Sequence, residues 1–233
     1  MRHRSIFSKA IGILVSKGWK GLLRSVFYYL KPTFISLYIL KRDLTVIEEP
    51  SVIPEFPEEM KVYFIRTKQE LDSMISDGYD IISGIDGVIK LLNRGAIAQF
   101  VFVGHELAHY GFLAMNQRAM DAISQPYPCL VDFANHEAYG CLAKTFDKFR
   151  GKGLMAYAGF LRFEYLKENG IVSVKGLVES KNLSAIRSHI KKDAKVYGKG
   201  LYIYIRILRW KFWKETLFPQ PVFLRDLTST LKR

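Results

Sequence analysis

The sequence predicts a mixed fold of class α+β (or α/β), because strand-like and helical stretches alternate along its central part without a repeat. Its 233 residues suit one sizeable domain with an appendage. A composition of 49% hydrophobic and 24% charged residues is that of a chain that folds. Two cysteines, Cys129 and Cys141, are too few for a disulfide framework. This favours a reducing compartment, and we expect a cytoplasmic protein.

The basic charge of the chain is concentrated at its N-terminus. The formal net charge is +13, and every charged side chain before Asp43 is a lysine or arginine. Between residues 5 and 31, apolar and basic side chains recur at helical spacing on different faces, which predicts an amphipathic basic helix. Two interpretations remain open. Residues 1–42 lie on an anionic membrane surface, at the inner face of the membrane, or the helix packs on the domain itself.

Three regions are expected from these patterns. Residues 1–57 form a basic amphipathic helical extension and linker, residues 58–208 form the main domain, and residues 209–233 form an aromatic and basic tail. The linker is predicted over residues 48–59, which are rich in proline, serine and glutamate. The tail contains Trp210-Lys211-Phe212-Trp213-Lys214, which is typical either of an interfacial belt or of aromatic packing on a last strand. The apolar stretches are shorter than the roughly 20 residues of a spanning helix, so no transmembrane segment is expected.

The elements of the main domain follow from local signals. Thr67, with Glu70 three residues later, predicts the start of a helix over 67–77, and Asn169-Gly170 predicts the end of a helix over 154–168. Further helices are expected over 86–93, before Gly95, and over 182–192. Strands are expected over residues 61–66, 96–103, 107–115, 134–146, 171–178 and 201–208.

The glycine-rich loop that precedes the helix at 154 is the most informative segment. It reads Phe149-Arg150-Gly151-Lys152-Gly153-Leu154. Two glycines let the backbone approach an anion closely, Arg150 and Lys152 add positive charge, and the helix start directs free N–H groups outward. The loop therefore indicates a pyrophosphate-binding site. A Gly-x-Gly turn alone is also compatible with an ordinary strand-to-helix connection.

A competing motif lies upstream at His105-Glu106-Leu107-Ala108-His109, which has the HExxH pattern. On a helix, both histidines would reach one zinc ion, Glu106 would polarise the bound water, and Glu137 would be a candidate third ligand. The surrounding residues instead favour two strands joined by a turn at Gly104-His105. On a strand the two histidines would be about 13 Å apart. We therefore expect surface or hairpin histidines and no metal, with a zinc-dependent hydrolase as the alternative function.

The order of elements over residues 60–205 resembles the GNAT superfamily of acyl-CoA-dependent N-acyltransferases. The superfamily signature, (Arg/Gln)-x-x-Gly-x-(Gly/Ala), aligns with Arg150 to Met155, and its downstream Asn-x-x-(Ala/Ser) with Asn182 and Ala185. The sequence departs from the pattern at Met155 and at Asp193-Ala194. The resemblance implies a mixed, mostly antiparallel central sheet flanked by helices, and an N-acetyltransferase activity.

The resemblance also implies a co-substrate site, with acetyl-CoA or another acyl-CoA and no metal. The backbone of Ala143, Lys144 and Thr145 would pair with the pantetheine arm. The pyrophosphate would be bound by the loop and the helix start, with Asn182 downstream; the loop residues are Arg150, Gly151, Lys152, Gly153, Leu154 and Met155. The acceptor would be a small amine or amino sugar, envelope- or lipid-associated in one interpretation. No nucleic-acid motif is present, so a nucleic-acid partner is not expected.

Two residues are candidates for proton transfer. Glu137 lies where the superfamily often carries a carboxylate, and burial would raise its pKa toward that of a useful base. The alternative role of Glu137 is a structural salt bridge. His189 stands where many relatives have a tyrosine that protonates the departing thiolate, and an imidazole is suited to this task. The alternative is an exposed helical histidine.

Overall fold

The computed structural model describes residues 15–16, 18–21, 32–45, 54–56, 59–81, 87–124, 126–190, 194–205 and 210–229. Its strands are β1 (Thr33–Asp43), β2 (Met60–Ile65), β3 (Ile97–Val103), β4 (Glu106–Ala114), β5 (Glu137–Thr145), β6 (Ser173–Glu179), β7 (Lys195–Ile205) and β8 (Trp210–Phe223). Its helices are α2 (Lys68–Ser76), α3 (Val88–Leu92), α4 (Gln117–Ile123), α5 (Leu154–Glu168), α6 (Leu183–Ile190) and α7 (Leu224–Ser229). The class is α+β, in agreement with the sequence prediction.

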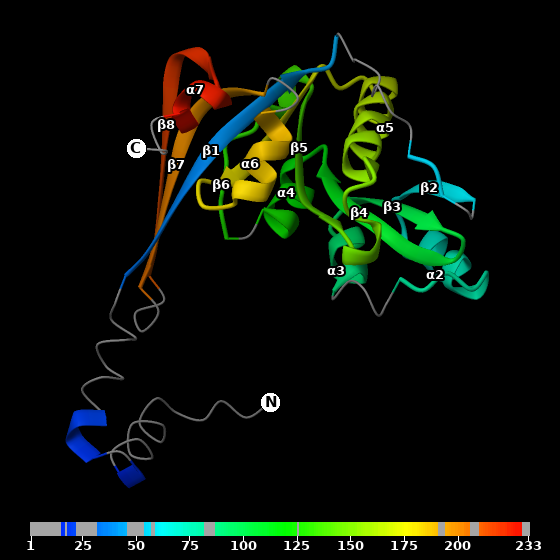
Figure 1. Ribbon diagram of the computed structural model, residues 1–233, viewed down its shortest axis with the longest axis horizontal. Coiled ribbons are helices and arrows are strands. Elements are labelled where there is room, and N and C mark those ends of the chain that lie inside the picture. Colours follow the sequence, from blue (N-terminus) through cyan, green and yellow to red (C-terminus); the bar gives the residue numbers. More distant parts are fainter. Residues whose placement is uncertain are drawn as a thin grey trace.

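The described strands form one sheet in the order β2-β3-β4-β5-β6-β1-β7-β8. Within it β5 and β6 run parallel, and the other neighbouring strands are antiparallel. Strands β1, β7 and β8 lie side by side and extend together from the body of the molecule (Figure 1). The prediction of a mostly antiparallel mixed sheet is confirmed.

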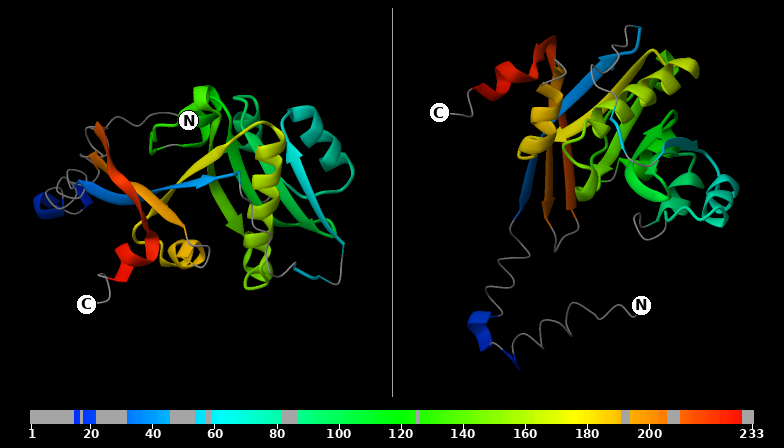
Figure 2. Two further views of the ribbon diagram at one scale, coloured as in Figure 1. Left: turned by 90° about the horizontal axis from the view of Figure 1, so that it is seen from above. Right: turned by 45° about the vertical axis from the view of Figure 1, so that its right-hand side comes forward.

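Helices cover both faces of this sheet (Figure 2). On one face, Leu71 of α2 and Met120 of α4 pack with Phe100, Phe102 and Phe112 of β3 and β4. On the other face, α5 covers β3, β4 and β5. Beside α5, helices α6 and α7 cover β1, β6 and β7. Strands β5 and β6 contribute side chains to the cores on both faces.

Several local predictions are confirmed. Thr67 accepts a hydrogen bond from the Glu70 amide at 3.2 Å, and Glu70 accepts from the Thr67 amide at 3.1 Å, so a capping box starts α2. Helix α5 has the predicted bounds. It ends where Gly170 adopts φ 78° and the Ile171 amide returns to the Leu166 carbonyl at 3.0 Å.

The assignment of residues 1–57 to an extension is wrong for residues 33–43. These residues form β1, which pairs with β6 on one side and β7 on the other. Leu37, Tyr38, Ile39 and Leu40 are buried, as expected of an apolar run inside a sheet. Residues 210–223, assigned to a tail, form β8 and pair with β7. The sheet therefore includes segments from both regions that we predicted to lie outside the domain.

Other predictions about the N-terminal region fall mostly outside the described residues. Of the helix expected over 5–31, residues 15–16 and 18–21 are described and are helical. Most of the linker over 48–59, including the boundary near residue 58, is not described. Among the described helices, none combines the length and hydropathy needed to cross a membrane.

Candidate functional site

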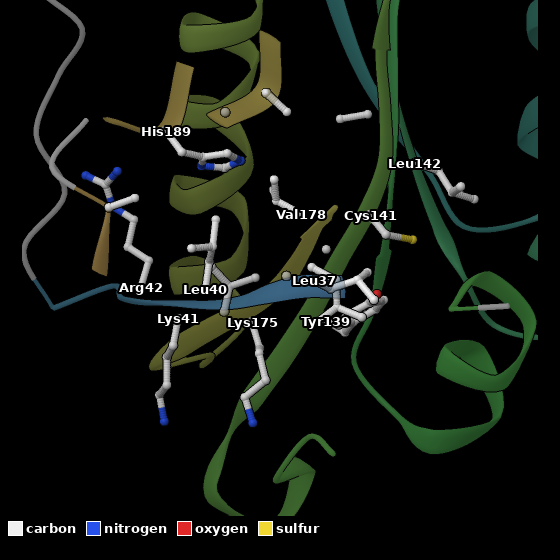
Figure 3. A pocket seen from close by; sticks show the side chains of 18 of the residues that line it. Leu37, Leu40, Lys41, Arg42, Tyr139, Cys141, Leu142, Lys175, Val178 and His189 are labelled. Atoms are coloured by element: carbon white, nitrogen blue, oxygen red, sulfur yellow. The ribbon is translucent and has the colours of Figure 1, made fainter. Parts of the chain in front are cut away.

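A cavity among the described residues opens where β5 and β6 separate. These strands pair through their first residues, from Glu137↔Ser173 to Tyr139↔Lys175, and then diverge. At the point of separation, a Cβ on Gly176 would lie 3.2 Å from the Gly140 carbonyl oxygen, so glycine allows the two backbones to approach closely. Beyond Tyr139, no described strand pairs with this edge of β5. A cavity of about 770 Å³ lies between the diverging strands (Figure 3).

A β-bulge shapes the β5 side of this cavity. The register between β4 and β5 shifts between Tyr110 and Phe112, and Leu142 adopts a φ of 53°. A positive φ is uncommon for a side chain such as leucine, and half of the Leu142 surface is exposed. Figure 3 shows Cys141 and Leu142 on β5, across the cavity from Val178. The bulge thus turns a length of exposed strand backbone toward the gap.

The glycine loop leads directly into α5. Gly151 and Gly153 have φ values of 79° and 78°, and Gly153 caps the helix without a side-chain hydrogen bond. From Gly151 through Met155, no backbone N–H group donates to a described acceptor. Arg150 is held at the loop, because its Nε donates to the Thr145 carbonyl at 3.1 Å and its Nη2 pairs with Asp147 at 2.9 Å. Unpaired N–H groups at a helix start, beside basic side chains, form an arrangement suited to a phosphate.

The structure brings part of the predicted site together. The cavity is lined by Ala143, Met155, Asn182 and His189, and it is not lined by Glu137, Lys144, Thr145, Arg150, Gly151, Lys152, Gly153 or Leu154. The Asn182 side chain accepts from the Ala185 amide at 3.1 Å and so caps α6. Lys144 lies over the Phe146 ring at 4.8 Å.

The environment of Glu137 differs from our expectation. Glu137 is 2% exposed, and its two carboxylate oxygens pair with Lys41 at 2.8 Å and Lys175 at 3.0 Å. It also accepts from the Asp132 amide at 3.0 Å. Burial alone would raise its pKa, but the hydrogen bonds from Lys41, Asp132 and Lys175 outweigh burial and hold the pKa below its ordinary value. The alternative role, a structural ion pair, therefore fits Glu137, and the expected raised pKa is corrected.

The HExxH segment is a β-hairpin and not a helix. His105 is exposed in the turn, where its ring stacks on Tyr79 at 4.8 Å, and Glu106 pairs with Lys148. His109 lies within β4 and is 1% exposed. Its Nδ1 lies 2.8 Å from the Thr145 hydroxyl. The hairpin is as predicted, although His109 is buried rather than at the surface. Strand geometry separates the two imidazoles, and no metal-binding group of three side chains occurs among the described residues.

Four functional candidates were missed in the sequence. Glu179 lies at the end of β6, lines the cavity and accepts a hydrogen bond from the Tyr127 hydroxyl at 2.6 Å. Burial and this hydrogen bond raise the pKa of Tyr127, so the phenol stays protonated. Arg162 of α5 and Cys141 of β5 line the same cavity. Arg162 had a sequence signal, since it interrupts the largely apolar run LMAYAGFLRF, whereas nothing local distinguished Glu179 or Tyr127.

The side chains around the cavity point to two sides of the sheet. In Figure 3, His189 lies on one side, and the ammonium groups of Lys41 and Lys175 point away from it to the other. Tyr38, Leu40 and Val178 pack with α6 on the His189 side. The cavity between β5 and β6 therefore lies between a face of the sheet that carries His189 and a face toward which Lys41 and Lys175 point.

Similar folds occur among solved structures. A GNAT-family acetyltransferase from Colwellia psychrerythraea is 9% identical, with 86% of this chain and 73% of that chain covered and a TM-score of 0.44. A tandem GNAT protein from the clavulanic acid biosynthesis pathway is 14% identical, with 80% and 55% covered and a TM-score of 0.46. An N-acetyltransferase from Kribbella flavida is 11% identical, with 70% and 54% covered and a TM-score of 0.37.

These likenesses are limited in extent. The chain spans little more than half the length of the last two structures. No protein-family model and no curated sequence matches the chain. At identities of 9–14%, these likenesses leave the chemistry of the site to its own residues. Several of the solved structures that this chain resembles are described as GNAT acetyltransferases.

Proposed function

We propose that this chain is an acyl-CoA-dependent N-acyltransferase. The observation that carries the proposal is the divergence of β5 from β6, which leaves one edge of β5 unpaired beside a cavity of about 770 Å³. An extended pantetheine arm binds such an edge as an added strand, through the backbone of Ala143, Lys144 and Thr145. The free N–H groups from Gly151 to Met155 then bind the pyrophosphate. The β5 backbone and the loop N–H groups would therefore bind the pantetheine and pyrophosphate parts of the same co-substrate molecule.

The proposed reaction transfers the acyl group to an amine. The neutral amine nitrogen attacks the thioester carbonyl, a C–N bond forms, the C–S bond breaks, and the thiolate leaves. The nitrogen loses one proton and the sulfur gains one. Catalysis requires a proton acceptor on the amine side and a proton donor near the sulfur.

Glu179 and His189 are suited to these two tasks. Glu179 is a cavity-lining carboxylate whose Tyr127 partner fixes its orientation, and it replaces Glu137 in this role. His189 lines the cavity from α6 and is the proposed donor to the leaving thiolate. The acceptor amine would then approach from the side of the sheet that carries Tyr127.

The proposal is tested by incubating the protein with acetyl-CoA and a panel of amines, including amino sugars, and measuring release of free thiol. We expect Glu179→Gln and His189→Ala each to lower kcat by about a hundredfold or more, which is the scale of general acid–base catalysis. His105→Ala is the matched control, because His105 is an exposed histidine outside the cavity. Equal loss in His105→Ala and His189→Ala, or turnover unchanged in all variants, would rule out these roles.

A further inference from the structure

The guanidinium of Arg162 contacts the side chains of Gln99 and His109. Its Nε donates to Gln99 Oε1 at 2.9 Å, and its Nη2 lies 3.4 Å from His109 Nε2. Gln99 and His109 are 0% and 1% exposed. Gln99 is fixed in turn, because its Nε2 donates to the Ala158 carbonyl at 2.8 Å. Among the described residues, no carboxylate pairs with Arg162, and no acceptor contacts its Nη1.

A partly buried cation without a carboxylate partner is disfavoured in a folded protein. Burial disfavours the charged form and lowers the pKa of Arg162 to about 10, which still leaves it positively charged at neutral pH. A well-packed apolar side chain would avoid this cost. Gln99 and His109 contact two of the guanidinium nitrogens, and neither side chain is a carboxylate. This arrangement is expected where a ligand supplies the negative charge.

Arg162 lines the cavity at a known distance from the start of α5. It lines that cavity together with Cys141 and Ala143, at the bulge of β5. A Cβ on Gly111 would lie 2.1 Å from Arg162 Nη2. Only a glycine at this position of β4 leaves room for the guanidinium to pack against the sheet. Arg162 follows Leu154 by eight residues, or about 12 Å along the axis of α5. A co-substrate with its pyrophosphate at the start of α5 would bring its acyl end toward this depth.

We propose that Arg162 binds a carboxylate at the far end of the acyl group, and that the preferred donor is therefore a CoA thioester of a short dicarboxylic acid. The planar guanidinium matches the geometry of a carboxylate. It would donate hydrogen bonds to the two carboxylate oxygens from Nη1 and from the second N–H of Nη2. An acetyl group offers no such partner. This inference rests on the proposed acyl-CoA site and adds the chemical class of the acyl group.

The test is calorimetric titration of the full chain with acetyl-CoA, succinyl-CoA and glutaryl-CoA. We expect a dicarboxylic thioester to bind at least tenfold more tightly than acetyl-CoA. Arg162→Gln should abolish this preference, so that the dicarboxylic thioesters bind no more tightly than acetyl-CoA. Gly111→Ala retains the charge but displaces the guanidinium, and should reduce the preference. Arg66→Gln is the control, because Arg66 contacts Tyr165 of α5 and its C-cap Asn169 and does not line the cavity.

The outcomes distinguish the two proposals. If the wild-type chain binds all three thioesters equally, the carboxylate subsite is wrong and the acyl-CoA site stands. If it binds none of them, the acyl-CoA site itself is wrong. If Arg162→Gln does not fold by circular dichroism, Gly111→Ala decides, and an undiminished preference in that variant overturns the inference.

Discussion

Glu137 ties three strands together at the residue scale. The carboxylate belongs to β5, and its two ammonium partners belong to β1 and β6, which flank the start of the cavity. Lys175 also donates to the Leu130 carbonyl at 2.6 Å, so the network continues into the loop before β5. The network holds β5 and β6 together just before they separate. A carboxylate that resembles a catalytic base in sequence is therefore part of the structure that supports the cavity.

Glu137→Gln should lower the free energy of unfolding at pH 7 by about 2 kcal/mol. This is less than for a fully buried pair, because the Lys41 side chain is 36% exposed. The folded-state pKa of Glu137 lies below its ordinary value of 4.5, so the ion pairs stabilise the protein above that pH. The stabilisation is lost as the pH falls through the folded-state pKa. Urea unfolding at several pH values should therefore show the difference from wild type shrinking between pH 7 and pH 3.

A control for this prediction is Glu59→Gln, which removes an exposed carboxylate paired with Lys61 at 3.2 Å. Exposed pairs contribute little, so this variant should change stability by less than about 0.5 kcal/mol at either pH. A difference that grows on acidification in Glu137→Gln would contradict the assignment of Glu137 as a charged structural residue.

At the scale of the element, the bulge in β5 leads to a prediction about the stability of variants at Leu142. Leu142→Val should destabilise the protein by about 1–2 kcal/mol, because a β-branched side chain tolerates the φ of 53° poorly. Ala143→Val, at the next exposed position of the same strand, should be close to neutral. Thermal unfolding of both variants measures the difference. Equal effects at the two positions would show that Leu142 has no special backbone conformation.

Local signals predicted most elements of the main domain. The capping box at Thr67 and the glycine stop at Gly170 are contained within a few residues, so α2 and α5 could be found from sequence. Strand β1 could not, because its partners β6 and β7 lie 130 residues or more away in the chain. Its apolar run is too short for a membrane-spanning helix, and no local signal identifies it as a strand of this sheet. Helix α4, with its Asn116 cap, was also missed.

The candidate site was predictable where it depends on one segment. The glycine loop and the cavity-lining residues Ala143, Met155 and His189 were all found from spacing and resemblance. The roles of Glu137 and Glu179 depend on side chains that arrive from other strands and loops, and no local pattern encodes them. Arg162 was visible as a charge in an apolar helix, but its partners Gln99 and His109 were not.

At the scale of the whole molecule, the position of β1 divides the N-terminal region into two parts. Residues 33–43 belong to the central sheet, and residues 1–31 precede it. Deleting residues 1–31 should leave the sheet intact, because the pairing of β1 begins at Thr33. Deleting residues 1–45 should abolish cooperative unfolding, because β6 and β7 would lose their shared neighbour. Circular dichroism during heating separates the two cases. A cooperative transition in the shorter chain would contradict the central place of β1.

The chain without residues 1–31 also tests the expected contact with an anionic membrane. Trp210 and Phe212 of β8 are 47% and 39% exposed, and residues 1–31 contain seven lysine and arginine residues and no acidic residue. Flotation with anionic liposomes should recover the full chain and much less of the shortened one, because each basic residue near the surface contributes about 1 kcal/mol. Equal recovery of both chains would show that residues 1–31 do not contribute to membrane binding.

The most direct test of the acyl-CoA site is titration of acetyl-CoA into the wild-type chain, Gly153→Ala and Gly170→Ala. The two glycines flank α5 with the same φ of 78°, and a Cβ at either would meet nothing within 4 Å, so both variants carry the same backbone strain. Only Gly153 lies at the proposed pyrophosphate site. We predict one molecule bound per wild-type chain, unchanged affinity in Gly170→Ala, and at least tenfold weaker binding in Gly153→Ala. No binding by the wild-type chain, or equal affinity in the two variants, would contradict the account.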